Sequence, residues 1–88
     1  GFPEQWIEVL GARLMRVHFK DYRLDIDHFG GFTHLLQGDV RWPQVMQALH
    51  RVRYDGWAIV EVPPYRSCPE QAIFDSAAAM RRLLALAV

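Results

Sequence analysis

The sequence predicts an α/β fold in which parallel strands alternate with helices. Two apolar segments with strand character, 14–20 and 57–62, flank a stretch, 43–53, whose apolar residues recur at helical spacing. A second long helical segment, 69–87, follows the later strand. Strand, helix, strand and helix in this order are typical of a parallel sheet whose strands are connected by helices.

Length and composition limit the class of protein. Eighty-eight residues form at most one small domain, and 51% apolar residues with ten acidic against ten basic residues argue against disorder. The basic residues are nine Arg and Lys20, scattered among acids, so no basic stripe predicts a nucleic-acid partner. No segment has the apolar length of a membrane span. The single Cys68 excludes an internal disulfide, which fits a reducing compartment such as the cytoplasm.

The chain is expected to begin with a helix over residues 3–11. Pro3 suits the first helical turn, and the negative charge of Glu4 is favourable near a helix N-terminus. Apolar side chains then recur at helical spacing: Trp6, Ile7, Leu10 and Leu14. Gly11 is expected to end the helix, because glycine is the usual residue beyond a helix C-terminus.

The strand at 14–20 carries the sequence RVHFKD at its end. Val17 and Phe19 point to one face of a strand, and the basic side chains point to the other: Arg16, His18 and Lys20. Residues 22–41 then show no sustained periodicity and contain three glycines, so they are predicted to form a long loop. Loops of this length are often functional.

The segment 43–53 has Pro43 in its first turn and Asp39 as an expected cap. Its apolar face is formed by Val45, Leu49 and Val52. The strand 57–62 is apolar on both faces, as a parallel strand covered by helices must be, and two prolines end it. The last helix, 69–87, is expected to bury one side: Ile73, Ala77, Met80 and Leu84.

Polar side chains follow the two strands at their carboxyl ends, where α/β proteins collect their chemistry. His18, Lys20 and Asp21 end the first strand, and Glu61 lies in the apolar end of the second. An unpaired carboxylate there is costly, so Glu61 needs a cation, a metal or a hydrogen-bonded base. Imidazole and carboxylate together suit a divalent ion such as Mn²⁺, Mg²⁺, Co²⁺ or Zn²⁺. The alternative is structural: a backbone-bonded histidine and a glutamate in a salt bridge.

Three segments, VHFKDYR, LLQGDVRWPQVMQAL and YDGWAIVEV, resemble the last third of the xylose isomerase-like (β/α)₈ barrels. That family includes sugar and sugar-phosphate isomerases and epimerases, with inosose dehydratases and endonuclease IV-type enzymes among its relatives. The resemblance covers essentially the whole chain. It implies the C-terminal β7-α7-β8-α8 part of a (β/α)₈ TIM barrel, preceded by the helix at 3–11.

The resemblance also implies roles for five residues. His18 corresponds to the metal-ligand histidine of the seventh strand. Glu61 corresponds to the glutamate of the eighth strand, which binds the metal and acts as one of two acid/base carboxylates. Lys20 and Asp21 match a Lys-Asp pair that supports the mouth of the site. Arg23 approximates a substrate-contacting arginine of the epimerases, although it lies one residue away from the expected spacing.

The long loop departs from the family pattern. Gln37 stands where the family often has Glu, and Leu36 replaces a usual Gly, which argues against a direct role for this part of the loop. The endonuclease-type enzymes use Asp-x-His here, whereas this chain reads Asp25-Ile26-Asp27-His28. We therefore expect His28 and His34 to be solvated loop residues rather than ligands of a second metal.

The resemblance implies a metal-dependent isomerase or epimerase acting on a small sugar, sugar phosphate or hydroxy-keto acid through an enediolate. A keto-inositol-type dehydratase with the same base remains an alternative, as does an inactive fragment or assembly module. A DNA-repair phosphodiesterase is disfavoured because the Asp-x-His triplet and a basic surface are absent.

Chain length conflicts with a complete barrel. A (β/α)₈ barrel takes roughly 200–250 residues, and this sequence supplies two of its eight strands. The resemblance implies a small sugar-like substrate. Because the barrel is incomplete, the other expected partner is either the rest of a barrel or further copies of the chain. A two-stranded parallel unit has two open edges, so the chain alone is expected to be poorly stable and inactive.

Overall fold

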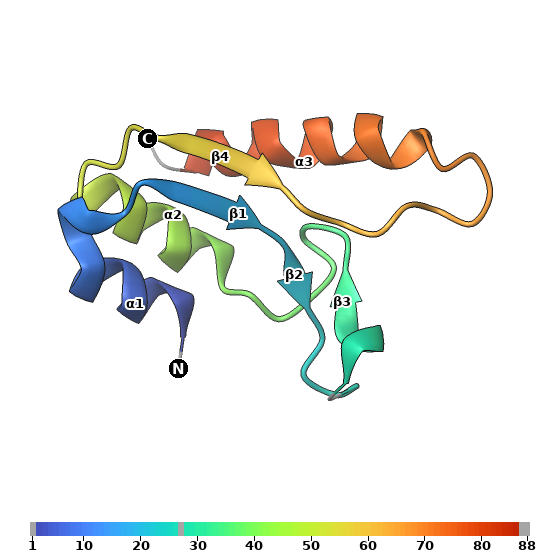
Figure 1. The fold of residues 1–88 in the computed structure, drawn as a ribbon, viewed down its shortest axis with the longest axis horizontal. Helices are drawn as coiled ribbons and strands as arrows, with labels where there is room; N and C mark the ends of the chain where they lie inside the picture. The colour runs from blue at the N-terminus through green and yellow to red at the C-terminus, as the bar shows by residue number, and fades with distance from the viewer. Residues whose placement is uncertain (1, 27, 87–88) are drawn as a thin grey trace.

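The computed structural model describes residues 2–26 and 28–86 (Figure 1). Residue 87, where the last helix was predicted to end, and Asp27 of the loop lie outside the described residues. The elements follow the chain as α1 (Pro3–Leu10), η1 (Gly11–Arg13), β1 (Arg16–Phe19), β2 (Asp21–Tyr22), η2 (Phe29–Gly31), β3 (Phe32–Thr33), α2 (Trp42–Arg51), β4 (Trp57–Val60) and α3 (Gln71–Leu86), where η1 and η2 are short 3₁₀ turns.

The two strands β1 and β4 form a parallel pair, as predicted from their apolar composition. His18 lies opposite Ile59 and Phe19 lies opposite Val60, and both strands point the same way in Figure 1, with α2 below them. One further backbone bond, from Glu61 N to Phe19 O at 2.9 Å, continues the ladder beyond β4. This pairing brings the carboxyl ends of the strands together.

The core lies between this sheet and the helices. Helix α1 packs on α2, and α2 packs on α3. Phe19 of β1 is 1% exposed, and its ring lies 5.2 Å from that of Trp42 at the start of α2. The other buried core residues are Ile7, Leu35, Val45, Met46, Ala48, Leu49 and Leu83. Burial of one large apolar side chain contributes roughly 1.5–3 kcal/mol, so this cluster fixes the helices against one face of the sheet.

The segment predicted as one long loop is largely irregular, but it contains a 3₁₀ turn and takes part in a small antiparallel pair, so the prediction was wrong for these residues. Asp21 pairs with Thr33 and Tyr22 pairs with Phe32, forming β2 and β3. Each of these strands has only two residues, too few to show the alternation by which a strand is identified in a sequence. The pair stands beyond the carboxyl end of β1 (Figure 1).

Two details at the helix N-termini also differ from prediction. Asp39 does not cap α2: the N-cap is Arg41, without a side-chain cap, while Asp39 Oδ2 accepts a hydrogen bond from Leu24 N at 2.7 Å. Helix α3 begins at Gln71 rather than at residue 69, after Cys68 in a left-handed conformation (φ 51°). At the end of α1 the prediction is confirmed, because Gly11 is the C-cap with φ 51°.

The predicted buried side of α3 was wrong in part: Ala77 and Met80 are half-buried, and Met80 packs against the core, but the other two predicted residues are exposed. Ile73 is 71% exposed and Leu84 is also exposed, whereas Ala72, Ser76 and Leu83 are buried. Apolar residues occur around more than half of this helix, so their spacing alone does not identify the side that meets α2. Within the described residues, none of the helices has the length and apolar character needed to cross a membrane.

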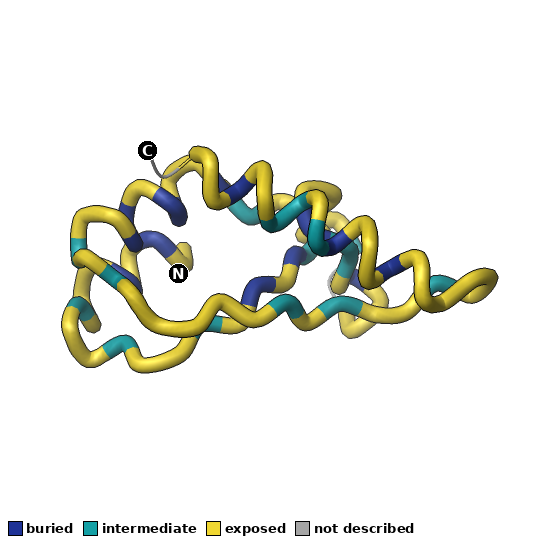
Figure 2. Tube along the Cα trace, turned by 90° about the horizontal axis from the view of Figure 1, so that it is seen from above, coloured by how far each residue is buried: buried dark blue, intermediate teal, exposed yellow. Residues whose placement is uncertain are grey.

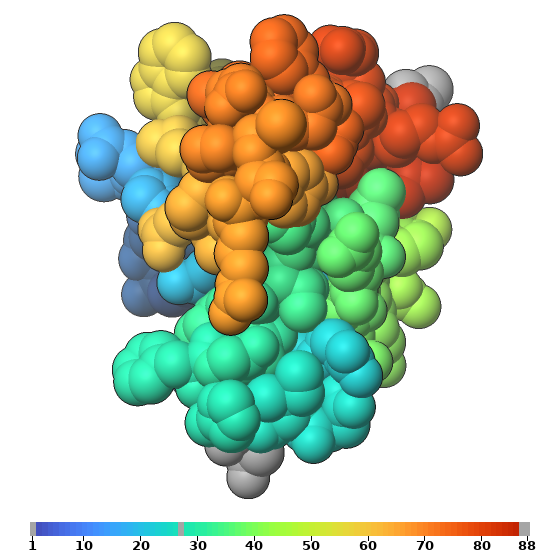
Figure 3. All heavy atoms as spheres, turned by 90° about the vertical axis from the view of Figure 1, so that its right-hand side faces the viewer, coloured from blue at the N-terminus to red at the C-terminus, as the bar shows by residue number. Residues whose placement is uncertain are grey.

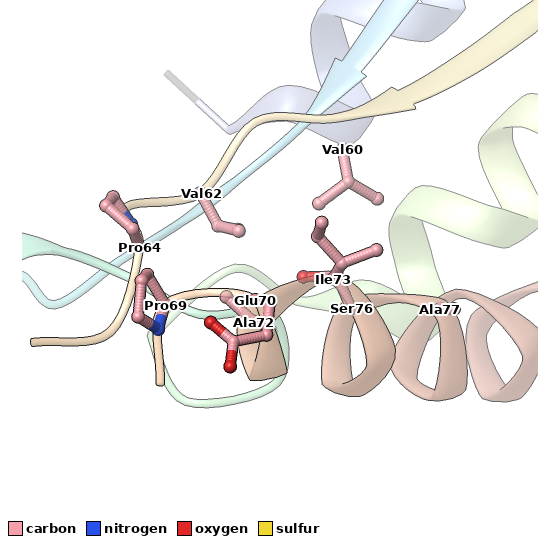
Figure 4. Close-up of a pocket in the computed structure, with 9 residues that line it drawn as sticks. All are labelled: Val60, Val62, Pro64, Pro69, Glu70, Ala72, Ile73, Ser76 and Ala77. Atoms are coloured by element: carbon pink, nitrogen blue, oxygen red, sulfur yellow. The ribbon is translucent and has the colours of Figure 1, made fainter. Parts of the chain in front are cut away.

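A large apolar surface remains open beside β4. A groove of about 630 Å³ separates the end of this strand from the first turns of α3, and Figure 4 shows Val60, Val62 and Ile73 around it. The strand itself is mostly exposed (Figure 2). An exposed strand edge next to an apolar groove is the surface that a further strand and helix would cover.

Candidate functional site

His18 and Glu61 meet at the carboxyl ends of β1 and β4. His18 Nδ1 donates a hydrogen bond to Glu61 Oε2 at 3.0 Å, because an ionised carboxylate can only accept. Their side chains are 46% and 55% exposed, so both are open to a ligand. The strand pairing explains their meeting: Ile59 lies opposite His18, and Glu61, two residues beyond Ile59, projects from the same face.

Lys20 completes this cluster. Its Nζ donates to Glu61 Oε1 at 3.1 Å and also lies 5.0 Å from the centre of the Phe32 ring of β3. The hydrogen bond from His18, followed by the hydrogen bond and charge of Lys20, holds the pKa of Glu61 below its ordinary value of 4.5. Glu61 is therefore an ionised carboxylate at neutral pH. Lys20 and Glu61 thus also form the salt bridge expected if Glu61 has a structural role.

Asp21 does not lie at the open surface with these residues. Its side chain is fully buried, and its carboxylate accepts four hydrogen bonds. The donors are Tyr22 N at 2.9 Å, Leu36 N at 3.0 Å, Val40 N at 3.1 Å and Trp42 Nε1 at 2.8 Å. Asp21 therefore joins the end of β1 to the return of the loop and to the start of α2. It supports the site from below and positions Lys20, its neighbour in the chain.

The remaining predicted residues lie apart from the cluster. Arg23 forms a two-point ion pair with Asp25, at 2.7 and 3.2 Å, and no hydrogen bond to the cluster within the described residues. His28 Nδ1 accepts from Gly30 N at 2.9 Å, which gives it a local structural role. His34 is half-buried and stacks on Tyr65, with ring centres 4.4 Å apart, so the expectation that it is solvated was wrong.

A family model for the xylose isomerase-like TIM barrel matches residues 1–83. The chain belongs to the xylose isomerase-like TIM-barrel family. No curated protein and no solved structure matches it. The match and the α/β architecture agree with the fold class predicted from the sequence.

His18 and Glu61 of this family member could supply two of the ligands of a divalent-metal site. An imidazole and a carboxylate converge within 3.0 Å, and both belong to the ligand types of Mn²⁺ and Zn²⁺. Within residues 2–26 and 28–86, no group of three or more His, Cys, Asp or Glu side chains could hold a metal ion, at this site or at any other. His18 and Glu61 would therefore bind an ion only together with ligands from outside these residues, and the ion would compete with Lys20 for the carboxylate.

A second polar cluster joins the segment after β4 to α3, and sequence reasoning missed it. Tyr65 Oη donates to Asp75 Oδ2 at 2.7 Å, and Gln71 Nε2 donates to Asp75 Oδ1 at 3.1 Å. The ring of Tyr65 also contacts the ring of His34, as described above. The sequence feature that could have indicated this cluster is the position of Tyr65 in the segment after a strand, because functional residues of α/β proteins often lie in such segments. Figure 3 shows the molecule from the right-hand side of Figure 1, with the segment after β4 (orange) above the loop that follows β1 (cyan and green).

Replacing Tyr65 with phenylalanine is expected to raise the pKa of Asp75. The hydrogen bond from Tyr65, followed by that from Gln71, holds this pKa below its ordinary value of 3.8. A carboxyl group whose pKa is lowered by folding stabilises the folded protein at pH values above its pKa in the unfolded chain. This stabilisation is lost as the pH falls through the lowered pKa of the folded state. Carboxyl ¹³C NMR titration measures the change. Tyr54→Phe is the matched control, because Tyr54 Oη donates to Trp57 O instead; equal pKa values for Asp75 in both variants would contradict the assignment.

Proposed function

We propose that this chain is part of a divalent-metal-dependent isomerase or epimerase acting on a small sugar, sugar phosphate or hydroxy-keto acid. The contact of His18 with Glu61 at the carboxyl ends of adjacent parallel strands carries the proposal. Membership of the xylose isomerase-like family, which fits the sugar isomerase and epimerase superfamily, agrees with it. Active sites of TIM barrels lie at this end of the strands.

Glu61 is the proposed acid/base group. Because its carboxylate is ionised, it can accept a proton from the carbon next to a substrate carbonyl and return it to the neighbouring carbon, through an enediolate. His18 fixes the orientation of this carboxylate by its hydrogen bond. A divalent ion held by His18 and Glu61, with further ligands, would polarise the oxygens of the substrate.

Lys20 and the aromatic residues of the β2–β3 region complete the proposed site. Lys20 keeps Glu61 ionised before substrate binds, and its ammonium group is available to an anionic substrate oxygen. Phe29 is 90% exposed, and Phe32 lies between it and Tyr22 (Phe29–Phe32 ring centres 6.4 Å apart). We assign Phe29 and Phe32 to the cover over the substrate. Arg23 could contact substrate only after leaving Asp25.

Solvent isotope exchange tests this function. An enediolate mechanism transfers deuterium from D₂O to the carbon next to the carbonyl of a ketose or aldose, and ¹H NMR detects the exchange without knowledge of the product. The experiment requires the protein as its gene encodes it, with Mn²⁺ or Co²⁺ supplied. Exchange that stops on chelation is expected; exchange with loss of water instead indicates the dehydratase alternative. No exchange with any sugar, sugar phosphate or keto acid would contradict the proposal.

The 88-residue chain alone is expected to associate or to melt at low denaturant concentration. Both edges of the β1–β4 pair are open within the described residues, and the groove beside β4 has no cover. Size-exclusion chromatography with light scattering and a urea melt measure the two properties. A cooperative transition of a 10.2 kDa monomer would contradict the proposal that the chain is part of a larger barrel.

A further inference from the structure

A pocket of about 310 Å³, lined by both polar and apolar side chains, lies between the loop that follows β3 and the middle of α3. His34 and Gln37 line it from the loop, and Ser76 and Arg82 line it from the helix. It shares no residue with the cluster of His18, Lys20 and Glu61. It is also distinct from the apolar groove beside β4, although Ser76 lies at the border of both.

Two buried polar atoms at this pocket lack partners. Ser76 is 9% exposed, and its hydroxyl forms no hydrogen bond with the described residues. His34 Nδ1 is likewise buried and without a hydrogen bond. Buried polar groups are nearly always hydrogen-bonded, and leaving one unpaired is destabilising. Two such atoms from different elements around one pocket therefore indicate a ligand that pairs with them.

Arg82 supplies the positive charge that an anionic ligand in this pocket needs. Arg82 forms no ion pair with the described residues. Asp75 also lines the pocket, and its negative charge opposes an anion, although hydrogen bonds from Tyr65 and Gln71 partly offset that charge. The groups of this lining that have no partner among the described residues include a hydroxyl, an imidazole and a guanidinium, and all three can donate to an anion.

We propose that this pocket binds the oxyanion head of a small ligand, a phosphate or a carboxylate. Arg82 pairs with the oxyanion, because a guanidinium presents parallel donors to such groups. Ser76 donates from the helix and His34 donates from the loop. Leucine and alanine side chains line the rest of the pocket, so they accommodate a short apolar stem: Leu35, Leu36, Ala78 and Ala79. This site does not depend on the proposed isomerase activity.

Isothermal titration with inorganic phosphate and, separately, acetate tests the proposal, at constant ionic strength set with NaCl and on the protein as its gene encodes it. Arg82→Gln is expected to weaken binding by at least about tenfold. Arg81→Gln removes the same charge from the next position of α3, which does not line the pocket, and is expected to leave binding within about twofold. The tighter of the two anions identifies the class of head group.

Ser76→Ala gives an independent measurement. Removing an unpaired buried hydroxyl should leave the melting temperature unchanged or raise it without anion, because nothing is lost on the protein side. The same change should reduce the rise in melting temperature that the bound anion causes in the wild type. A purely structural serine would give a lower melting temperature and an unchanged response to the anion.

The binding and melting experiments together decide whether the anion site exists. Saturable binding that Arg82→Gln weakens and Arg81→Gln does not, with a reduced thermal response in Ser76→Ala, supports the site. Absence of saturable binding of both anions, or equal losses in the two arginine variants, overturns it. If Arg82→Gln alters the circular dichroism spectrum, the Ser76→Ala response decides in its place.

Discussion

Replacing Glu61 with glutamine is expected to lower turnover by about 10²–10⁴-fold in the complete enzyme, the usual loss when a general base is removed. Glutamine has the shape of glutamate, so His18 and Lys20 lose a charged acceptor while the strand end stays in place. The variant loses both a proton carrier and a negative metal ligand. Steady-state kcat, measured with the substrate found by isotope exchange, checks this prediction.

Glu70→Gln is the matched control, because Glu70 is exposed and forms no ion pair with the described residues. It should leave kcat unchanged. His18→Ala separates the two functions assigned to the cluster: excess Mn²⁺ or Co²⁺ should restore part of its activity, since Glu61 is intact. The same ions should not restore Glu61→Gln, because no ion replaces a base. Near-normal turnover of Glu61→Gln would exclude its role as the acid/base group.

The part of the site predicted from the sequence is the part that strand geometry determines. Glu61 follows Ile59, the residue opposite His18, by two positions, so parallel pairing brings both side chains to one face at the ends of the two apolar segments. Lys20 follows His18 by two residues and therefore shares its face. The fold class is predictable for the same reason, because the alternation of strands and helices is visible in the order of apolar residues.

What the sequence did not predict depends on contacts between distant segments. His34 and Tyr65 lie 31 positions apart in irregular segments, where no periodicity indicates which side chain faces which. The buried side of α3 is decided by Leu83 packing in the core, although Leu84 is equally apolar. Gly38 shows the same limit: a Cβ there would lie 2.6 Å from Tyr22 N, so only glycine permits this close approach. The sequence shows the glycine but not the neighbour.

Asp21 is the residue whose role changed most between sequence and structure, from the mouth of the site to the interior beneath it. Each of its two oxygens accepts two hydrogen bonds: Oδ1 from Tyr22 N and Val40 N, and Oδ2 from Leu36 N and Trp42 Nε1. The donors come from three separate parts of the chain. One carboxylate therefore holds the loop after β1 closed against α2.

Replacing Asp21 with alanine is expected to lower the free energy of unfolding by at least about 3 kcal/mol, since each buried donor left unpaired costs roughly 1–3 kcal/mol. That is a large share of the roughly 5–15 kcal/mol that stabilises a typical domain. Urea denaturation of the complete protein measures the loss. Turnover should fall as well, because the position of Lys20 beside Glu61 depends on the segment that Asp21 holds.

Two further substitutions separate this role from a general effect of removing an acidic residue. Asp21→Asn keeps one acceptor oxygen but turns an NH₂ group toward two of the four donors, so it should also be strongly destabilising. Asp25→Ala removes an exposed carboxylate of the same loop, whose ion pair with Arg23 contributes about 0–1 kcal/mol at most. If Asp21→Ala lost no more stability than Asp25→Ala, the four hydrogen bonds would not hold the loop, and the placement of Lys20 would need another cause.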